Sequence, residues 1–165
     1  MQLTSFTKNP IDLINWNRFD ILFKYLYGKA RDCGWNTTYY HDMYKHHLKI
    51  WNGFFELKNP RKNTFEIFQS DFDSLLDAIN TVGFDPSKSL VPVKNGQYVL
   101  NGAHRVAACL VYDKDVHCIA GEDVRDGQLD CSWRFFNSLE QLGKLDEGYA
   151  DKAALEYSKL KPQTR

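Results

Sequence analysis

The chain has 165 residues, of which 43% are hydrophobic and 15% aromatic, so it is too apolar for a disordered protein and fits one domain. Its 21 basic and 21 acidic side chains cancel, so no overall field would concentrate it on nucleic acid or on an anionic membrane. No apolar run reaches the ~18 residues of a membrane-spanning helix, the four cysteines form no CxxC pair, and no secretory signal is visible. We expect a cytoplasmic protein with reduced thiols and no membrane insertion, and nucleic acid is not an expected partner.

Residues 1–52 are expected to form a helical N-terminal extension. Apolar residues recur with helical spacing from Phe19 to Ala30 and again from Tyr40 to Trp51. Gly34 stands where the first of these two helices would end.

Residues 53–125 have the pattern of an α/β core. The segment from Phe54 to Leu57 is predicted to be a short strand. A helix follows, with Ser70 as its expected N-cap and Gly83 as its end.

The clearest local signal is the run from Leu90 to Leu100, where Asn95-Gly96 joins two β-prone segments and predicts a hairpin. Pro92 indicates that the first of these strands lies at an edge or is irregular. Apolar positions between Ala103 and Val111 then mark the buried face of a helix, and Val116 to Ala120 is predicted to be another strand.

Residues 126–165 are expected to form a C-terminal helical segment, with helices near Ser138 to Leu142 and from Tyr149 to Leu160. These helices would pack on the sheet or on a partner chain, so a homodimer is one arrangement that we consider. The expected fold is therefore a single α/β (α+β) domain, with a small mixed sheet flanked by helices at both ends of the chain.

The candidate site is the point where the second strand of the hairpin turns on glycine into a helix. Such a turn leaves unpaired backbone N–H groups at the positive end of the helix dipole, which suits a phosphate. An Arg in the first turn adds a bidentate donor, and a His adds an acid/base group or a second cation. The alternative is an ordinary helix start with a solvated polar pair. The segment consists of Asn101, Gly102, Ala103, His104 and Arg105.

The order of parts from Asn59 to Ala120 resembles the ParB/sulfiredoxin superfamily. The parts are an Asn-Pro-Arg-Lys turn at residues 59–62, a helix, Gly83, a Pro-containing strand, the Asn-Gly hairpin and the glycine motif at residues 102–105. The resemblance implies a ParB/sulfiredoxin-like fold that binds nucleotide phosphates at the glycine motif.

The departures from this family narrow the function. Chromosome-partitioning ParB proteins continue after the glycine with a Glu-Arg-Arg type sequence and carry a downstream helix-turn-helix, whereas here Ala103-His104-Arg105 follows and only about 60 residues remain. Sulfiredoxin requires a reactive Cys before the His-Arg pair, where this chain has Ala103. Cys109 lies on the expected buried side of the helix, so neither DNA segregation nor sulfinic-acid reduction is expected.

The motif is closest to that of the free serine kinases of this superfamily, in which Gly-x-His-Arg holds the nucleotide and a carboxylate of the first strand deprotonates an alcohol. The resemblance implies that Glu56 is this general base, because it lies in the predicted first strand among aromatic residues. The kinase motif around the carboxylate is not intact here. Asp71, Asp73 and Asp85 are alternatives, although capping of a helix or a turn explains each of them equally well.

We therefore expect a nucleotide-dependent phosphotransferase that acts on the hydroxyl of a small molecule, a sugar or polyol of surface-glycan metabolism being one candidate. The resemblance implies ATP or ADP, with CTP as a further option, and Mg²⁺, although the sequence shows no metal-ligand cluster. Two alternatives remain: a non-catalytic nucleotide-binding regulatory module, and a ParB-like nuclease, which the neutral net charge disfavours. The expected catalytic residues are Glu56, His104 and Arg105, the phosphate-binding residues are 101–105, and the expected substrate-binding residues are Asn52, Arg61 and Lys62.

Overall fold

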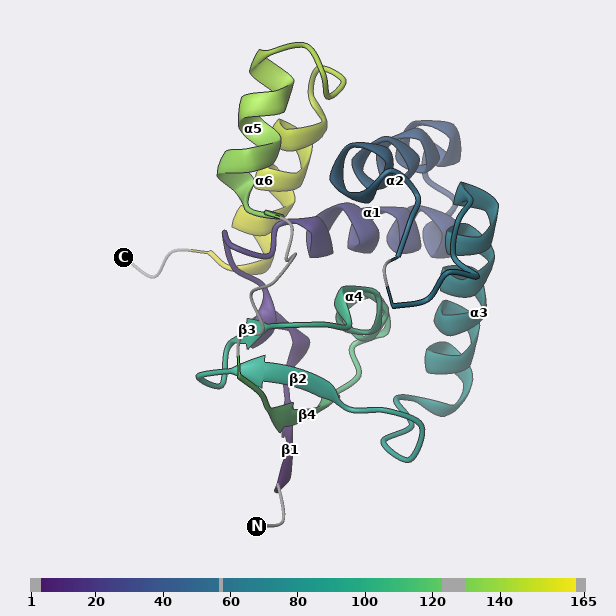
Figure 1. Ribbon diagram of the computed structural model, residues 1–165, viewed down its shortest axis with the longest axis vertical. Coiled ribbons are helices and arrows are strands. Elements are labelled where there is room, and N and C mark those ends of the chain that lie inside the picture. Colours follow the sequence, from purple (N-terminus) through teal and green to yellow (C-terminus); the bar gives the residue numbers. More distant parts are fainter. Residues whose placement is uncertain (1–3, 57, 123–129, 163–165) are drawn as a thin grey trace.

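The computed structural model describes residues 4–56, 58–122 and 130–162, and these form a mixed α/β fold (Figure 1). The prediction of an α/β (α+β) domain with a small mixed sheet flanked by helices is confirmed. In chain order the elements are β1 (Ser5–Lys8), a 3-10 helix (Pro10–Leu13), α1 (Asp20–Cys33), α2 (Thr37–Asn52), α3 (Phe65–Val82), β2 (Val91–Lys94), β3 (Tyr98–Val99), α4 (Ala103–Tyr112), β4 (Val116–Ala120), α5 (Trp133–Gln141) and α6 (Tyr149–Leu160).

The described sheet has the order β1-β4-β2-β3. Strand β2 runs parallel to β4 and antiparallel to β3, and β1 runs antiparallel to β4, with Lys8 opposite Val116. Strand β1 corrects the expectation that residues 1–52 form a purely helical extension. Its four residues include only one large apolar side chain, Phe6, which is too short and too polar a pattern to predict a strand.

The predicted hairpin is confirmed, but the expected edge position of Pro92 is wrong, because β2 is an interior strand. The carbonyl of Pro92 accepts from the N–H of Leu100, so the Pro92 nitrogen also faces the β3 side. Beyond the paired residues Tyr98 and Val99, Leu100 lies opposite Pro92. Because proline has no N–H, this last pair is joined by one hydrogen bond instead of two, and the loss falls at the end of the pairing with β3.

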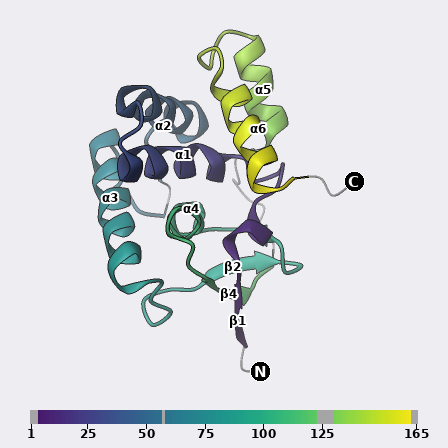
Figure 2. The same cartoon turned by 180° about the vertical axis from the view of Figure 1, so that it is seen from behind.

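Helix α4 lies between the sheet and α1, as the two opposite views show (Figures 1 and 2). Seven of its ten residues are buried, on nearly every side, as expected for a helix covered by a sheet and by other helices. Helix α1 is likewise buried along most of its length, including the charged residues Asp20 and Lys24. The buried hydrophobic residues of the described chain, from Leu13 to Ala153, form one core.

Three other sequence predictions need correction. The segment from Phe54 to Glu56 is a turn, and Leu57 lies outside the described residues, so the predicted strand is wrong for the part that is described. Helix α3 begins after Thr64, whose hydroxyl accepts from the N–H of Ile67, so Ser70 lies inside the helix. The helix expected near Ser138 begins earlier, at Trp133.

All four cysteines are free in the structure, and Cys109, Cys118 and Cys131 are buried. Burial raises the pKa of Cys109 to about 12, which leaves it unreactive near neutral pH. None of the helices in the described ranges is both long enough and apolar enough to cross a bilayer.

Candidate functional site

The segment at residues 101–105 forms the predicted strand-turn-helix junction. Gly102 adopts φ 97°, in the left-handed region, and its carbonyl accepts the first helical hydrogen bond, from Val106 N–H at 3.0 Å. Its own N–H donates to Oδ1 of Asn101 at 2.8 Å. In the described structure, the N–H groups of Ala103, His104 and Arg105 have no protein acceptor. The free amides are therefore those of the first helical turn, and the amide of Gly102, expected to contact phosphate, is occupied.

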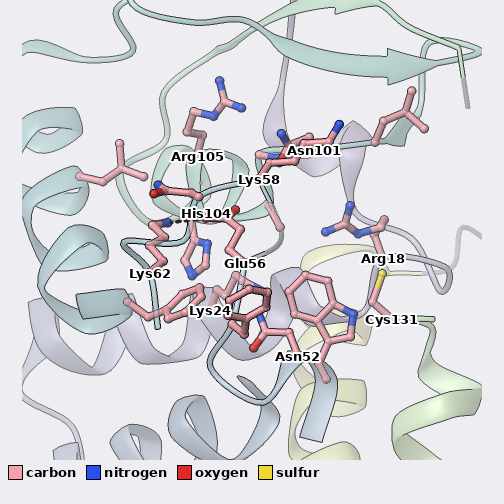
Figure 3. A pocket seen from close by; sticks show the side chains of 18 residues that line it. Arg18, Lys24, Asn52, Glu56, Lys58, Lys62, Asn101, His104, Arg105 and Cys131 are labelled. Atoms are coloured by element: carbon pink, nitrogen blue, oxygen red, sulfur yellow. Dashed lines mark hydrogen bonds and ion pairs between the residues drawn. The ribbon is translucent and has the colours of Figure 1, made fainter. Parts of the chain in front are cut away.

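Arg105 is held against the glycine turn. Its Nη1 donates to Ser89 Oγ at 2.6 Å and to the Leu90 carbonyl at 3.2 Å. A Cβ atom at Gly102 would lie 2.7 Å from Arg105 Nη2, so the guanidinium could keep its present position only next to a glycine. Figure 3 shows that Arg105 and His104 extend from α4 in opposite directions. The junction therefore fixes a cation next to the free amides.

His104 points into the protein and is hydrogen-bonded. Its Nε2 lies 2.9 Å from the hydroxyl of Tyr44, and its ring packs edge-on against Phe72. Burial first, and then the nearby charge of Lys24, hold the pKa of His104 well below its ordinary value. Of the two roles considered for His104, the neutral acid/base or hydrogen-bonding role fits the structure better than that of a second cation.

Glu56 lies in the turn that follows α2, where backbone hydrogen bonds join it to Asn59 and Lys62. Its Oε2 is 3.6 Å from Nζ of Lys62, and its side chain is 42% exposed. The expected enclosure among aromatic residues is absent, because Phe55 is itself 47% exposed. Glu56 is therefore a partly solvated carboxylate with a lysine partner.

A second cluster of charges, which the sequence analysis missed, lies at the start of α1. Asp20 is fully buried and accepts from Arg18 through both oxygens, at 3.0 and 2.9 Å, and from Lys24 at 2.8 Å. Burial by itself would raise the pKa of Asp20, but Arg18 and Lys24 outweigh it and hold the pKa below its ordinary range. The signal in the sequence was the pair Asp20 and Lys24, four residues apart within a nearly continuous apolar helix.

His47 completes this buried cluster. Its Nε2 lies 3.3 Å from Nζ of Lys24, and its Nδ1 contacts the carbonyl of Tyr44. Burial, followed by the charge of Lys24, lowers the pKa of His47 well below its ordinary value. Since a neutral ring must accept from Lys24 at Nε2, Nδ1 carries the hydrogen and donates to the carbonyl.

The glycine turn, Glu56, Arg18 and Lys24 line one cavity of about 590 Å³, a volume within the range of small-molecule sites, whereas Asp20 and His47 lie behind its wall. The cavity brings together the start of α4, the end of α2, the turn after it and the start of α1 (Figure 3). Among its described lining residues, Glu56 is the only carboxylate. The cationic side chains that line it are Arg18, Lys24, Lys58, Lys62 and Arg105.

The cavity contains all the site residues expected from the sequence except one. Glu56, Asn52, Lys62 and residues 101–105 line it. Arg61 does not; its side chain is 63% exposed and pairs with Asp71 at 2.7 Å. The expectation that Arg61 binds substrate therefore has no support in the geometry.

The alternative carboxylates do not line the cavity either. Asp71 pairs with Arg61, Asp73 accepts from the hydroxyl of Tyr27 at 2.8 Å, and Asp85 accepts from Ser87. Contacts within the protein thus explain all three.

The described residues do not fit a metal held by the protein. They contain no group of three or more His, Cys, Asp or Glu side chains suited to a metal ion, and Glu56 is paired with a lysine. Any Mg²⁺ would have to be held chiefly by phosphate oxygens of a bound nucleotide.

The chain was compared with protein-family models, with curated proteins and with solved structures, and nothing matches it in any of the three comparisons.

Proposed function

We propose that this cavity binds the phosphates of a nucleotide and that the protein transfers a phosphoryl group to the hydroxyl of a small molecule. The observation that carries the proposal is the convergence, in one cavity, of free helix-start amides, five cationic side chains and one carboxylate from distant parts of the chain. Phosphoryl transfer requires this combination, because it depends mainly on positioning and on the neutralisation of charge.

The N–H groups of Ala103 and His104 and the guanidinium of Arg105 are the donors for the phosphates. Hydrogen bonds to Ser89 and Leu90 already fix the position of Arg105 Nη1, so the Nη2 side is left for an oxygen of the nucleotide. A preorganised guanidinium loses little conformational entropy when the ligand binds.

Glu56 is the proposed general base. It takes the proton of the acceptor hydroxyl while the new O–P bond forms, and the bond between the terminal phosphorus and its bridging oxygen breaks, the nucleotide leaving with the electron pair. Lys62 lies within reach of Glu56. A phosphate group nearby competes for this ammonium, which would leave the carboxylate free to accept a proton.

One observation favours a second candidate, a module that binds the nucleotide without chemistry. Glu56 is the only carboxylate among the described lining residues, and Lys62 engages it. A carboxylate held in an ion pair in every state would not serve as a base.

Turnover separates the two candidates. The protein is mixed with ATP, Mg²⁺ and a panel of polyols, sugars and hydroxy acids, and nucleotide consumption is measured with and without each acceptor. The phosphotransferase proposal predicts acceptor-dependent consumption that Glu56→Gln abolishes, while nucleotide binding survives. Nucleotide binding is measured by thermal shift: a nucleotide at 100 times its Kd should add ~2.7 kcal/mol to the stability of the unaltered protein and of the Glu56→Gln variant alike. Binding without any turnover supports the module, and the absence of nucleotide binding contradicts both.

A further inference from the structure

The cavity has a second cationic side, away from the start of α4. In Figure 3, Arg18 and Cys131 lie on one side of the cavity, and Lys62 and Arg105 lie on the other. The proposed transfer reaction uses the latter side together with Glu56. It gives no role to Arg18 or to Lys24, which also line the cavity.

Among the described residues, the positive charges on this second side are not fully balanced by carboxylates. Arg18 and Lys24 share one carboxylate, Asp20, whose two oxygens they already occupy. The described residues provide no second carboxylate paired with either cation. A buried cation without a full counter-charge is costly, and burial lowers the pKa of Lys24 accordingly. An anion in the cavity would complete the cluster.

Arg18 also has donors to spare. Its Nε and Nη2 donate to Asp20 and its Nη1 donates to the carbonyl of Val99 at 2.8 Å, which uses three of the five N–H bonds of a guanidinium. Its side chain is 9% exposed and lines the cavity, and Asp20 holds the guanidinium in place. A guanidinium fixed in this way suits a carboxylate or a phosphate group.

We propose that this side of the cavity is the acceptor subsite, and that the acceptor is a hydroxylated compound that carries a negative charge, either a carboxylate or a phosphate group. This inference rests on the proposed phosphotransferase function and names its substrate class. The neighbouring aromatic side chains of Trp51 and Phe55 provide apolar surface for the carbon skeleton of such a compound.

The experiment measures anion binding when the nucleotide side is already occupied. The full chain is saturated with a non-hydrolysable ATP analogue and titrated with inorganic phosphate, with D-glycerate and with glycerol as the neutral counterpart of glycerate. The indole N–H resonance of Trp51, assigned with Trp51→Phe, reports binding within the cavity, because Trp51 lines it. We expect saturable shifts with phosphate, with glycerate or with both, and none with glycerol at equal concentration. The stronger of the two anions identifies the phosphate or the carboxylate as the preferred group.

Asn52→Asp tests the role of charge without changing shape. Asn52 lines the cavity, and its Oδ1 accepts from the N–H of Phe54 at 2.9 Å, a bond that aspartate preserves. The added negative charge should weaken anion binding at least fivefold, and by a larger factor than it weakens binding of the ATP analogue. Asn80→Asp, exposed on α3 and outside the cavity, makes the same charge change and should alter neither.

Each result is decisive. If the analogue does not bind, the proposed function itself fails. If the analogue binds and no anion then binds, or glycerol binds as well as glycerate, only the acceptor subsite is overturned. Equal weakening by Asn52→Asp and Asn80→Asp also overturns it, because the effect would then come from net charge alone.

Discussion

Two clusters in this protein each consist of one arginine, one lysine and one aspartate, but one cluster is buried and the other is exposed to solvent. At the start of α1, Arg18 and Lys24 contact Asp20, and all three side chains are at most 9% exposed. In the turn before α3 and in α3 itself, Arg61 and Lys62 contact Asp71, with side chains that are 19–63% exposed.

The difference between these clusters shows which charges are fixed and which can exchange partners. A buried ion pair is hard to open, since each ion has lost its water, whereas an exposed pair gains little over hydration. Arg18 and Lys24 are therefore held in fixed positions at the side of the cavity that they line. Lys62, which is near both Glu56 and Asp71, can turn to a ligand at low cost.

The largest expected effect comes from breaking the buried cluster. Asp20→Asn leaves Arg18 and Lys24 buried without a counter-charge and should lower the free energy of unfolding by ~3–5 kcal/mol. Asp71→Asn is the matched change in the exposed cluster and should cost less than ~1 kcal/mol. Urea unfolding of both variants measures the contrast. Equal losses would show that burial does not distinguish the clusters.

The second prediction concerns pH and the two buried histidines. The folded pKa values of His47 and His104 lie well below the ordinary value of 6.5, so below that pH the unfolded chain binds protons that the folded chain does not. The stabilisation is fully present above pH 6.5 and should fall by up to ~1.4 kcal/mol per pH unit for each histidine on acidification. Unfolding measured between pH 7.5 and 5.5 gives the slope, and His47→Gln should reduce it. A flat profile would contradict the burial of both rings.

The hairpin and the helix start could be predicted because their signals are local: Asn95-Gly96 and Gly102 demand backbone conformations that few other residues adopt. The buried cluster of Arg18, Asp20 and Lys24 could not be predicted, because its burial depends on α4 and on the helices that pack around α1. The strand predicted from Phe54 shows the opposite error, in which a local pattern predicted an element that residues 54–56 do not form. Phe54 adopts φ 64° after Gly53, and its ring packs on Phe65 rather than in the sheet. Apolar residues in a short run do not reveal which surface they will cover.

A smaller effect is expected at the glycine turn. Gly102→Ala combines a left-handed φ of 97° with a Cβ that would clash with Arg105, so we expect a loss of ~1–2 kcal/mol and about a tenfold weaker nucleotide affinity. Gly96→Ala, also at positive φ but with nothing within 4 Å, provides the control for backbone strain alone. Calorimetry of nucleotide binding compares them. Equal affinity in the two variants would mean that the position of Arg105 is unimportant.

The smallest effect tests the boundary of the cavity. Arg61→Ala should change stability by less than ~1 kcal/mol and leave nucleotide and acceptor binding unchanged, because Arg61 lies outside the cavity and its pair with Asp71 is exposed. Lys62→Met should weaken nucleotide binding, because Lys62 lines the cavity. The nucleotide dissociation constants of Arg61→Ala and Lys62→Met, measured under the same conditions, show which of the two residues contacts the nucleotide. A larger loss with Arg61→Ala would place the binding surface on the outer side of the turn.

The pairing of β1 with β4 has a consequence for biosynthesis. Lys8 leaves the ribosome long before its partner Val116 exists, so through most of translation β1 has no strand to join. A short strand in which Phe6 is the only large apolar residue is a poor nucleus for association between nascent chains during this interval. The sheet therefore closes late, after the β2–β3 hairpin and α4 have emerged, and β1 waits for β4 although it precedes every other strand of the described sheet.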